Sequence, residues 1–250
     1  MNIAIVTGAS SGLGKAFADE LDKKGMDEIW LIARRENRLN AQKEQMKTPV
    51  KVFAMDLAEE YSQETLRSIL QGQRPNIVYL INSAGIGLYG ECTKNAYEEV
   101  AHLVKLNVNA LVALTTMALP YIRAGGKIIQ VSSAASFAPV ANFSAYAASK
   151  AFVTSWARSM NRELHDSQIT VTAVCPGQVE TEFFNAASGQ KPKWKEKRPI
   201  TPEKVVKKAL LDAGKGRDIS VCGVKAKCKQ LGGKILPHKV ILYFGRNLYR

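Results

Sequence analysis

A tyrosine and a lysine four residues apart form the first pair in this sequence with the makings of a reactive site. Tyr146 and Lys150 fall on one face of an expected helix. A free tyrosine has a pKa of about 10, and a nearby ammonium favours the phenolate, so we expect Lys150 to lower the pKa of Tyr146. Such a tyrosine can protonate a carbonyl oxygen as general acid or deprotonate an alcohol as general base.

A serine at the end of an expected strand completes this group. Ser133 lies 13 residues before Tyr146 and can donate a hydrogen bond to the same substrate oxygen, which stabilises developing negative charge. Each residue has an ordinary alternative, because Tyr-x-x-x-Lys is frequent on exposed helices and a strand often ends in serine. Asn107 is similarly explained as a buried polar group that needs partners. The combination, rather than any single member, supports the interpretation.

A glycine-rich turn near the amino terminus points to a phosphate ligand. The segment from Thr7 to Gly14 follows the first apolar run and opens an amphipathic segment near Lys15. Glycines let the backbone turn sharply and approach a ligand, and the amino end of a helix attracts phosphate. Such turns also occur without a ligand, but the position between first strand and first helix favours a dinucleotide pyrophosphate.

The second expected strand ends in a way that bears on the choice of dinucleotide. Ala33 and Arg34 stand where an NAD-selective site would carry an acid, and Arg34 can pair with a 2′-phosphate, which favours NADP(H). Alternatively, Arg34 and Arg35 form a solvated strand end. Asp56 closes the third strand, where it can accept from the adenine amine or act as an ordinary helix cap.

Apolar, β-branched runs alternate with longer amphipathic segments along most of the chain. This pattern is typical of parallel strands joined by helices, with the strands covered on both faces. We expect one α/β Rossmann-type domain over residues 1–250, doubly wound, with a central parallel sheet of about seven strands and a substrate loop at 179–200. The expected strands are 2–7, 28–33, 50–55, 76–81, 127–132, 169–175 and 218–222, and the longest expected helices are 97–121 and 145–164.

Taken together, these motifs resemble the short-chain dehydrogenase/reductase family over about residues 1–185. The resemblance rests on the glycine turn, Asn82-Ser83-Ala84-Gly85, Asn107, Ser133, Tyr146-Ala-Ala-Ser-Lys150 and Pro176-Gly177, in the family's order and spacing. Ser83 departs from the pattern, since a second asparagine is commoner there. The resemblance implies an NADPH-dependent oxidoreductase that moves a hydride between nicotinamide and a carbonyl or alcohol substrate.

The resemblance also assigns roles to residues. It implies that Lys150 holds the nicotinamide ribose, that Asn107 supports a water relay to Lys150, and that Val179 and Thr181 contact the cofactor. Asn107, Ser133, Tyr146 and Lys150 are the candidate catalytic residues. The candidate cofactor-binding residues are Gly8, Ser10, Ser11, Gly12, Leu13, Gly14, Arg34, Asp56, Leu57, Asn82, Ala84, Gly85, Tyr146, Lys150, Pro176, Gly177, Val179 and Thr181.

Aromatic and apolar residues near the expected site suggest the substrate class. They favour a pocket for a bulky hydrophobic ketone, such as a steroid, a lipid or an acyl chain, although loop aromatics also simply pack a loop down. A non-catalytic NADPH-binding redox sensor and a lyase or epimerase on the same scaffold are the alternative functions. The residues concerned are Ile86, Leu88, Tyr89, Phe137, Phe143, Phe183, Phe184 and Trp194.

The positive charge of the chain is concentrated at its end. Residues 191–250 hold 17 Lys or Arg and 4 Asp or Glu, so the whole net charge of +13 lies there. In the basic extension at 223–250, a helix started by Pro237 would place Leu236, Val240, Phe244 and Leu248 in one stripe. Three interpretations stay open: a surface packed on the domain or a second subunit, a membrane-surface helix, and a site for an acidic partner.

Other features narrow the class of protein. The sequence starts without a secretory leader and holds no run near the roughly 18 apolar residues that span a bilayer, which predicts a cytoplasmic protein. The four cysteines lack metal-site spacing, and the three histidines are isolated, so we expect free thiols and no metal. Aromatic residues are not interleaved with the basic ones, so we expect no nucleic-acid partner. The two longest helices resemble those the family uses to form dimers and tetramers, and we expect a homo-oligomer.

Overall fold

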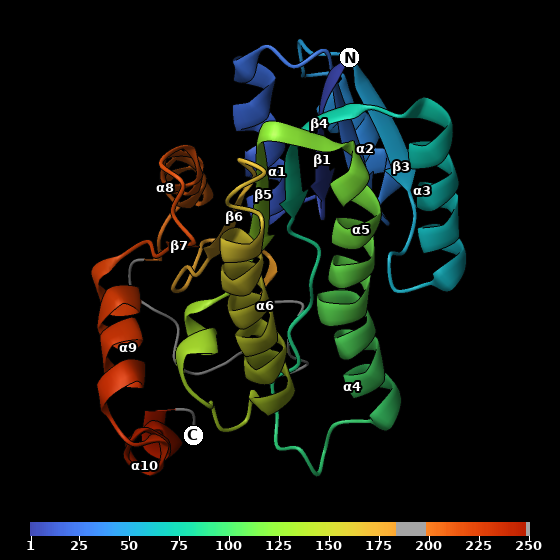
Figure 1. Ribbon diagram of the computed structural model, residues 1–250. Coiled ribbons are helices and arrows are strands. Elements are labelled where there is room, and N and C mark those ends of the chain that lie inside the picture. Colours follow the sequence, from blue (N-terminus) through green and yellow to red (C-terminus); the bar gives the residue numbers. More distant parts are fainter. Residues whose placement is uncertain (184–198, 249–250) are drawn as a thin grey trace.

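Seven parallel strands form one sheet with helices on both faces (Figure 1). The computed structural model describes residues 1–183 and 199–248. The strand order is β3-β2-β1-β4-β5-β6-β7, which reverses direction between β1 and β4 and confirms the doubly wound class. The strands are β1 (Asn2–Thr7), β2 (Glu28–Ala33), β3 (Val50–Ala54), β4 (Asn76–Asn82), β5 (Ile122–Val131), β6 (Thr170–Val174) and β7 (Ile219–Ser220).

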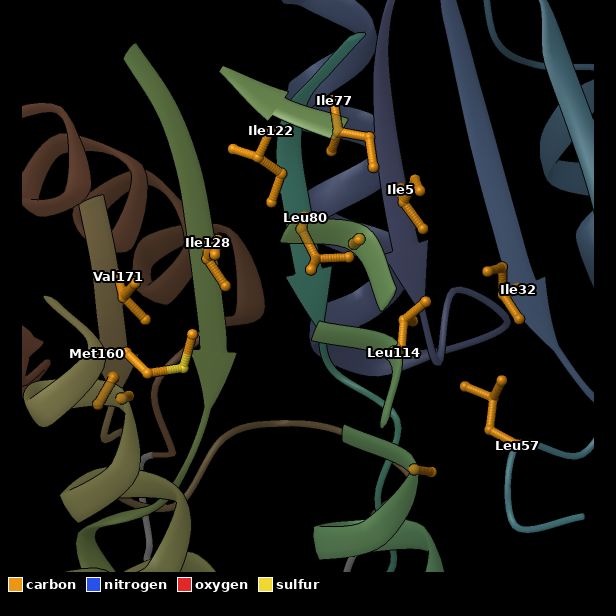
Figure 2. Close-up of a cluster of buried hydrophobic side chains, with 14 of the residues drawn as sticks. Ile5, Ile32, Leu57, Ile77, Leu80, Leu114, Ile122, Ile128, Met160 and Val171 are labelled. Atoms are coloured by element: carbon orange, nitrogen blue, oxygen red, sulfur yellow. The ribbon is translucent and has the colours of Figure 1, made fainter. Parts of the chain in front are cut away.

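The helices divide into two layers. Alternate residues of β1 point to opposite faces, so Ile3 and Ile5 join one core cluster while Ala4 and Val6 join the other. The first cluster packs under α3, α5 and α6, as Figure 2 shows for Ile5, Leu114 and Met160. The second packs under α1 and α8, which lie side by side. The helices are α1 (Gly12–Leu21), α2 (Glu36–Lys43), α3 (Glu60–Gln73), α4 (Tyr97–Val104), α5 (Leu111–Ala118), α6 (Ser144–Glu163), α8 (Pro202–Gly214), α9 (Val224–Ile235) and α10 (His238–Leu248).

One helical run among the described residues is long and apolar enough to cross a membrane by length and composition alone. It is Tyr97–Tyr121, 25 residues long, whereas the sequence led us to expect no such run. It comprises α4, a π-helical turn at Lys105–Ala110, α5 and a 3-10 turn at Leu119–Tyr121. Its apolar window is 44% buried within the protein, and Leu103 and Leu114 are fully part of the core. Because core helices also pass this test, we assign the run to the core.

Two segments differ from expectation. The fifth strand begins at Ile122 rather than near residue 127, and its pairing with β4 shifts register between Ile77 and Tyr79, which accommodates Gly125 and Gly126. The expected loop at 179–200 starts and ends on a bridge between Val179 and Ile200. Its centre, with Phe184 and Trp194, lies outside the described residues.

The basic extension holds two helices, of which only α10 was expected. The additional helix, α9, runs through Gly232 and Gly233 although glycine weakens helices. Tertiary packing explains this, because α9 lies against the 3-10 turn Ala134–Phe137, and a Cβ at Gly233 would collide with the carbonyl oxygen of Phe137. Gly233 is therefore the point of closest approach between the extension and the domain.

Two adjacent glycine substitutions test this packing. We expect Gly233→Ala to destabilise the docked α9 by about 1–3 kcal/mol, because the backbone of Phe137 cannot yield to the new methyl group. Gly232→Ala is the matched control, since its Cβ would meet only Leu236 at an ordinary 3.8 Å and should stabilise the helix by about 1 kcal/mol. Urea unfolding and limited proteolysis within 223–248 measure both effects. Equal effects of the two substitutions would contradict the packing argument.

Candidate active site

A cavity of about 650 Å³ lies where the carboxyl ends of the strands meet the C-terminal helices. Its lining follows the strands in order, with Gly8 after β1, Arg34 after β2, Asp56 after β3, Ala84 after β4 and Ser133 after β5. This is the edge at which doubly wound sheets bind ligands, on either side of the point where the strand order reverses. The cavity is therefore the candidate active site.

Tyr146 is buried at the cavity wall among aromatic rings. Its ring stacks on Phe143 with centroids 4.3 Å apart and lies 5.3 Å from the ring of Phe183. Burial raises the pKa of Tyr146 to about 12, and a hydrogen bond with Ser133 offsets this only in part. The expected lowering of the Tyr146 pKa by Lys150 is therefore wrong, because burial of the phenol has the largest effect on this pKa.

Lys150 lies one helical turn further along α6, and its Nζ is 5.7 Å from the centroid of the Tyr146 ring. The ammonium donates to the carbonyl oxygen of Val131 at 2.8 Å. Burial lowers the pKa of Lys150 to about 8. At neutral pH the site thus holds a protonated phenol beside a lysine that gives up its proton readily.

Asn107 lies directly behind this pair. It occupies the π-helical turn between α4 and α5, a rare geometry that often marks functional sites. Its Oδ1 accepts from the amide of Ile86 at 2.9 Å, and its Nδ2 donates to the Ile86 carbonyl at 2.9 Å. A Cβ at Gly85 would lie 3.0 Å from Asn107 Oδ1 and 3.3 Å from Lys150 Nζ. A side chain at position 85 would therefore crowd both of these polar groups.

The glycine turn has the shape of a phosphate cradle. Gly8 has a φ of +65°, and a Cβ there would lie 2.8 Å from the amide nitrogen of Ala84, so only glycine fits. Thr7 Oγ1 fixes this contact by accepting from the amides of Ser83 and Ala84, both at 3.0 Å. The N-cap residue Ser11 makes no side-chain hydrogen bond to the first turn of α1, which leaves these amides directed at the cavity. The geometry fits a dinucleotide pyrophosphate.

The two arginines after β2 bind different partners. Arg34 is exposed and pairs with Asp56 at 3.5 Å, while Asp56 also accepts from the amide of Ala58 and so caps its own turn. Arg35, for which a solvated strand end was an equal interpretation, donates to Ser10 and Ser11 of the glycine turn at 3.1 and 2.7 Å. Its other nitrogen binds Glu182 at 3.0 Å.

Glu182 is a site residue that the sequence did not indicate. It binds Arg35 and also Arg38, at 2.9 Å, across 144 positions of sequence. Hydrogen bonds from these two arginines hold the pKa of Glu182 below its usual range. Glu182 thus places a carboxylate between two arginines, and it lines the same cavity as Arg34, the residue that the sequence predicts to pair with a 2′-phosphate. In the sequence, the acidic segment Glu180-Thr181-Glu182 after β6 is the only hint of this residue. The sequence does not indicate that Glu182 lies beside the arginines after β2.

Most, but not all, of the predicted cofactor-binding residues line the cavity. Gly14 lies behind the wall, where a Cβ would collide with the Gly8 carbonyl. Asn82 is buried and donates to Thr115 at 2.8 Å. The predicted residues on the lining are Gly8, Ser10, Ser11, Gly12, Leu13, Arg34, Asp56, Leu57, Ala84, Gly85, Tyr146, Lys150, Pro176, Gly177, Val179 and Thr181.

The expected apolar pocket forms in part from the residues predicted for it. Ile86, Phe137, Phe143 and Phe183 line the cavity, whereas Leu88 and Tyr89 pack behind Phe143. The sequence missed the wall contributed by α9 and α10, which adds Lys229, Gly232, Gly233, Leu236, Val240, Ile241 and Leu242. Within the described residues, no group of three or more His, Cys, Asp or Glu side chains could hold a metal ion.

Comparison with known proteins identifies the family. Residues 2–192 match the family model for short chain dehydrogenases. An uncharacterised oxidoreductase of Staphylococcus epidermidis is 32% identical over 72% of this chain and 78% of its own. The very-long-chain 3-oxoacyl-CoA reductase of Bos taurus is 30% identical over 84% of this chain and 68% of its own.

A solved structure agrees with this result. The short-chain dehydrogenase from Sphingobium yanoikuyae in complex with NADPH superposes with a TM-score of 0.81 at 27% identity, covering 94% of this chain and 93% of that one. The fold and the site describe a dinucleotide-binding oxidoreductase. The chain belongs to the short-chain dehydrogenase/reductase family, which confirms the resemblance seen in the sequence.

The buried lysine makes stability depend on pH in a defined direction. Its pKa is about 8 in the folded protein against 10.5 for an ordinary lysine, so between these values the unfolded chain binds more protons and stability rises with pH. Relative to Lys150→Met, we expect the wild type to gain up to about 3 kcal/mol between about pH 7 and pH 10. Urea unfolding across this range measures it. Lys43→Met, at an exposed lysine, is the control: because it keeps Lys150, its stability should change with pH as that of the wild type does. Parallel curves for wild type and Lys150→Met would refute the prediction.

Proposed function

We propose that this protein is an NADPH-dependent oxidoreductase that interconverts a bulky hydrophobic ketone and its alcohol, with Tyr146 as the proton donor or acceptor. One observation carries the proposal. The cavity that holds Tyr146, Lys150 and Ser133 is continuous with the glycine turn and with an apolar wall. Reactive groups, a phosphate cradle and an apolar substrate surface thus share one enclosed space.

The nicotinamide, when bound, supplies or accepts the hydride, and the residues of the chain handle the proton. Tyr146 keeps its proton at neutral pH because burial raises its pKa to about 12, so it is ready to act as general acid on a carbonyl oxygen. Ser133 is hydrogen-bonded to Tyr146 and is placed to stabilise charge on the same oxygen. Lys150, with a pKa of about 8, can restore the proton from solvent through the polar space at Gly85 and Asn107.

The arginines after β2 support the choice of NADP(H). Arg35 and Arg38 present two guanidinium groups beside Ser10 and Ser11, and both already bind a carboxylate. A 2′-phosphate offers more negative charge and more acceptor atoms than that carboxylate, so it should displace Glu182. Arg34 lies next to Asp56 on the adenine side of the same region. The NADPH complex of the Sphingobium yanoikuyae relative agrees with this choice.

The walls of the cavity support a hydrophobic substrate. Phe137, Phe143 and Phe183 face it from the domain, and Leu236 and Val240 face it from the C-terminal helices. The relative from Bos taurus is named for a very long acyl chain, which is consistent with an acyl-type or lipid-type ketone.

We further propose a cytoplasmic homo-oligomer. All four cysteines are free thiols, which suits a reducing compartment. The outer surfaces of the neighbouring helices α4 and α6 expose Val104 and Phe152, and the Phe152 ring stacks on Trp156. Exposed aromatic and apolar groups on adjacent long helices are typical of a subunit contact.

Removing the phenol hydroxyl tests the reaction. We expect Tyr146→Phe to lower the turnover of bulky aromatic or long-chain ketones with NADPH by a factor of 10² or more, because the general acid is lost. Binding of NADPH, followed by nicotinamide fluorescence, should change little, since the ring still packs on Phe143. Tyr97→Phe, at an exposed tyrosine, is the control. Undiminished turnover by Tyr146→Phe would exclude Tyr146 as the acid.

Cofactor selectivity is tested by changing Arg35 and its carboxylate partner separately. We expect Arg35→Ala to weaken NADPH binding about tenfold and to leave NADH binding nearly unchanged, because only NADPH carries the phosphate. Glu182→Gln should strengthen NADPH binding several-fold, because a competing anion is removed. Titration of each variant with both cofactors measures this. If NADH binds the wild type as tightly as NADPH, the NADP(H) assignment fails.

A further inference from the structure

The outer face of α9 is a continuous apolar stripe. Val224, Cys228, Leu231 and Ile235 are spaced by four, three and four residues, so they lie on one side of the helix. Val224, Leu231 and Ile235 are 77%, 60% and 68% exposed. The opposite side is the docked one, because Ala226 is buried there and Gly233 meets Phe137. The stripe therefore points away from the domain.

Cations border this stripe. Lys227 and Lys234 are exposed and lie about 40° and about 60° around the helix from Leu231, on the same edge of the stripe, by the helical spacing of about 100° per residue. The whole extension at 223–250 carries seven Lys or Arg and no Asp or Glu. An apolar strip with lysines along its edge is the pattern of a helix that lies in the surface of an anionic bilayer.

The apolar surface continues onto the next helix and reaches the cavity. Leu236, at the end of α9, and Leu242, in α10, are 48% and 38% exposed and also line the cavity. Tyr243 is 76% exposed, and tyrosine is enriched where proteins meet a membrane interface. Leu236 and Leu242 therefore belong both to the outer surface and to the cavity lining.

Charge decides between the possible occupants of this surface. A second copy of the chain would bring the same basic face against itself, and like charges there oppose association. An acidic protein would match the lysines but needs a groove or complementary surface. Helix α9 instead lies at the outer edge of the molecule (Figure 1), and Val224, Leu231 and Ile235 on its outer side are exposed. A bilayer with anionic headgroups accepts both the ridge of apolar side chains and the lysines beside it.

We propose that α9 and α10 bind the surface of anionic membranes, with the Val224–Ile235 stripe inserted among the lipids and the adjacent lysines on the headgroups. The domain would then rest with the mouth of its cavity against the bilayer. If the proposed function holds, a hydrophobic ketone dissolved in the membrane would reach Tyr146 between α9 and α10 without crossing water. Membrane binding itself does not depend on the reaction.

Co-sedimentation of the full chain with vesicles tests the proposal without turnover. We expect binding to vesicles of phosphatidylcholine mixed with phosphatidylserine, weak binding to phosphatidylcholine alone, and loss of binding as salt screens the lysines. Leu231→Asp with Ile235→Asp, and separately Lys227→Glu with Lys234→Glu, should each reduce the bound fraction at least tenfold. NADPH binding by these variants shows that they are folded.

Substitutions elsewhere on the surface show whether vesicle binding depends on the α9 face or only on the overall charge and hydrophobicity of the protein. Leu211→Asp changes an equally exposed leucine on α8, and Lys24→Glu changes an exposed lysine, so both should bind vesicles as the wild type does. The proposal is overturned if no vesicle binds the wild type at low salt, which would favour an acidic protein partner, or if the controls lose binding as much as the α9 variants. It is also overturned if light scattering shows an oligomer that Leu231→Asp with Ile235→Asp dissociates. None of these outcomes bears on whether NADPH and ketone react.

Discussion

The burial of Lys150 beside Tyr146 is the constraint around which the rest of the site is arranged. An ammonium group without solvent needs oxygen partners, and the Val131 carbonyl at the end of β5 provides one. The same burial moves the two pKa values in opposite directions, raising that of Tyr146 to about 12 and lowering that of Lys150 to about 8.

The sheet explains how such a costly pair is held in place. The strand order reverses between β1 and β4. At this point the glycine turn after β1 packs against the backbone of Ala84 after β4, so closely that a side chain in place of Gly8 would collide with it. Asn107 bonds to both backbone groups of Ile86, so the segment after β4 is fixed from two sides. These contacts are made by backbone and buried polar groups, which are far less tolerant of movement than apolar packing.

How far the sequence predicted this structure depends on the range of the interactions involved. Strands such as Asn2–Thr7, the glycine turn and the Tyr146 and Lys150 pair follow from local patterns, and the sheet brings them together as expected. The predicted direction of the shift in the Tyr146 pKa was wrong, because desolvation depends on which residues the whole fold places around the ring. The Arg35 and Glu182 pair joins residues 147 positions apart, and no local pattern reports such a contact.

The candidate proton-transfer residues and part of the cavity wall come from different regions of the chain. The match to the family model ends at residue 192, and the residues for proton transfer all precede that point. Yet α9 and α10 contribute Leu236, Val240 and Leu242 to the cavity wall. Helix α9 thus has an inner side that contributes to the cavity wall and an outer side that is apolar and basic. Helix α9 can stay docked in this double role because Gly233 lets it approach Phe137 at backbone distance, so a change at this glycine would alter the cavity and the outer face together.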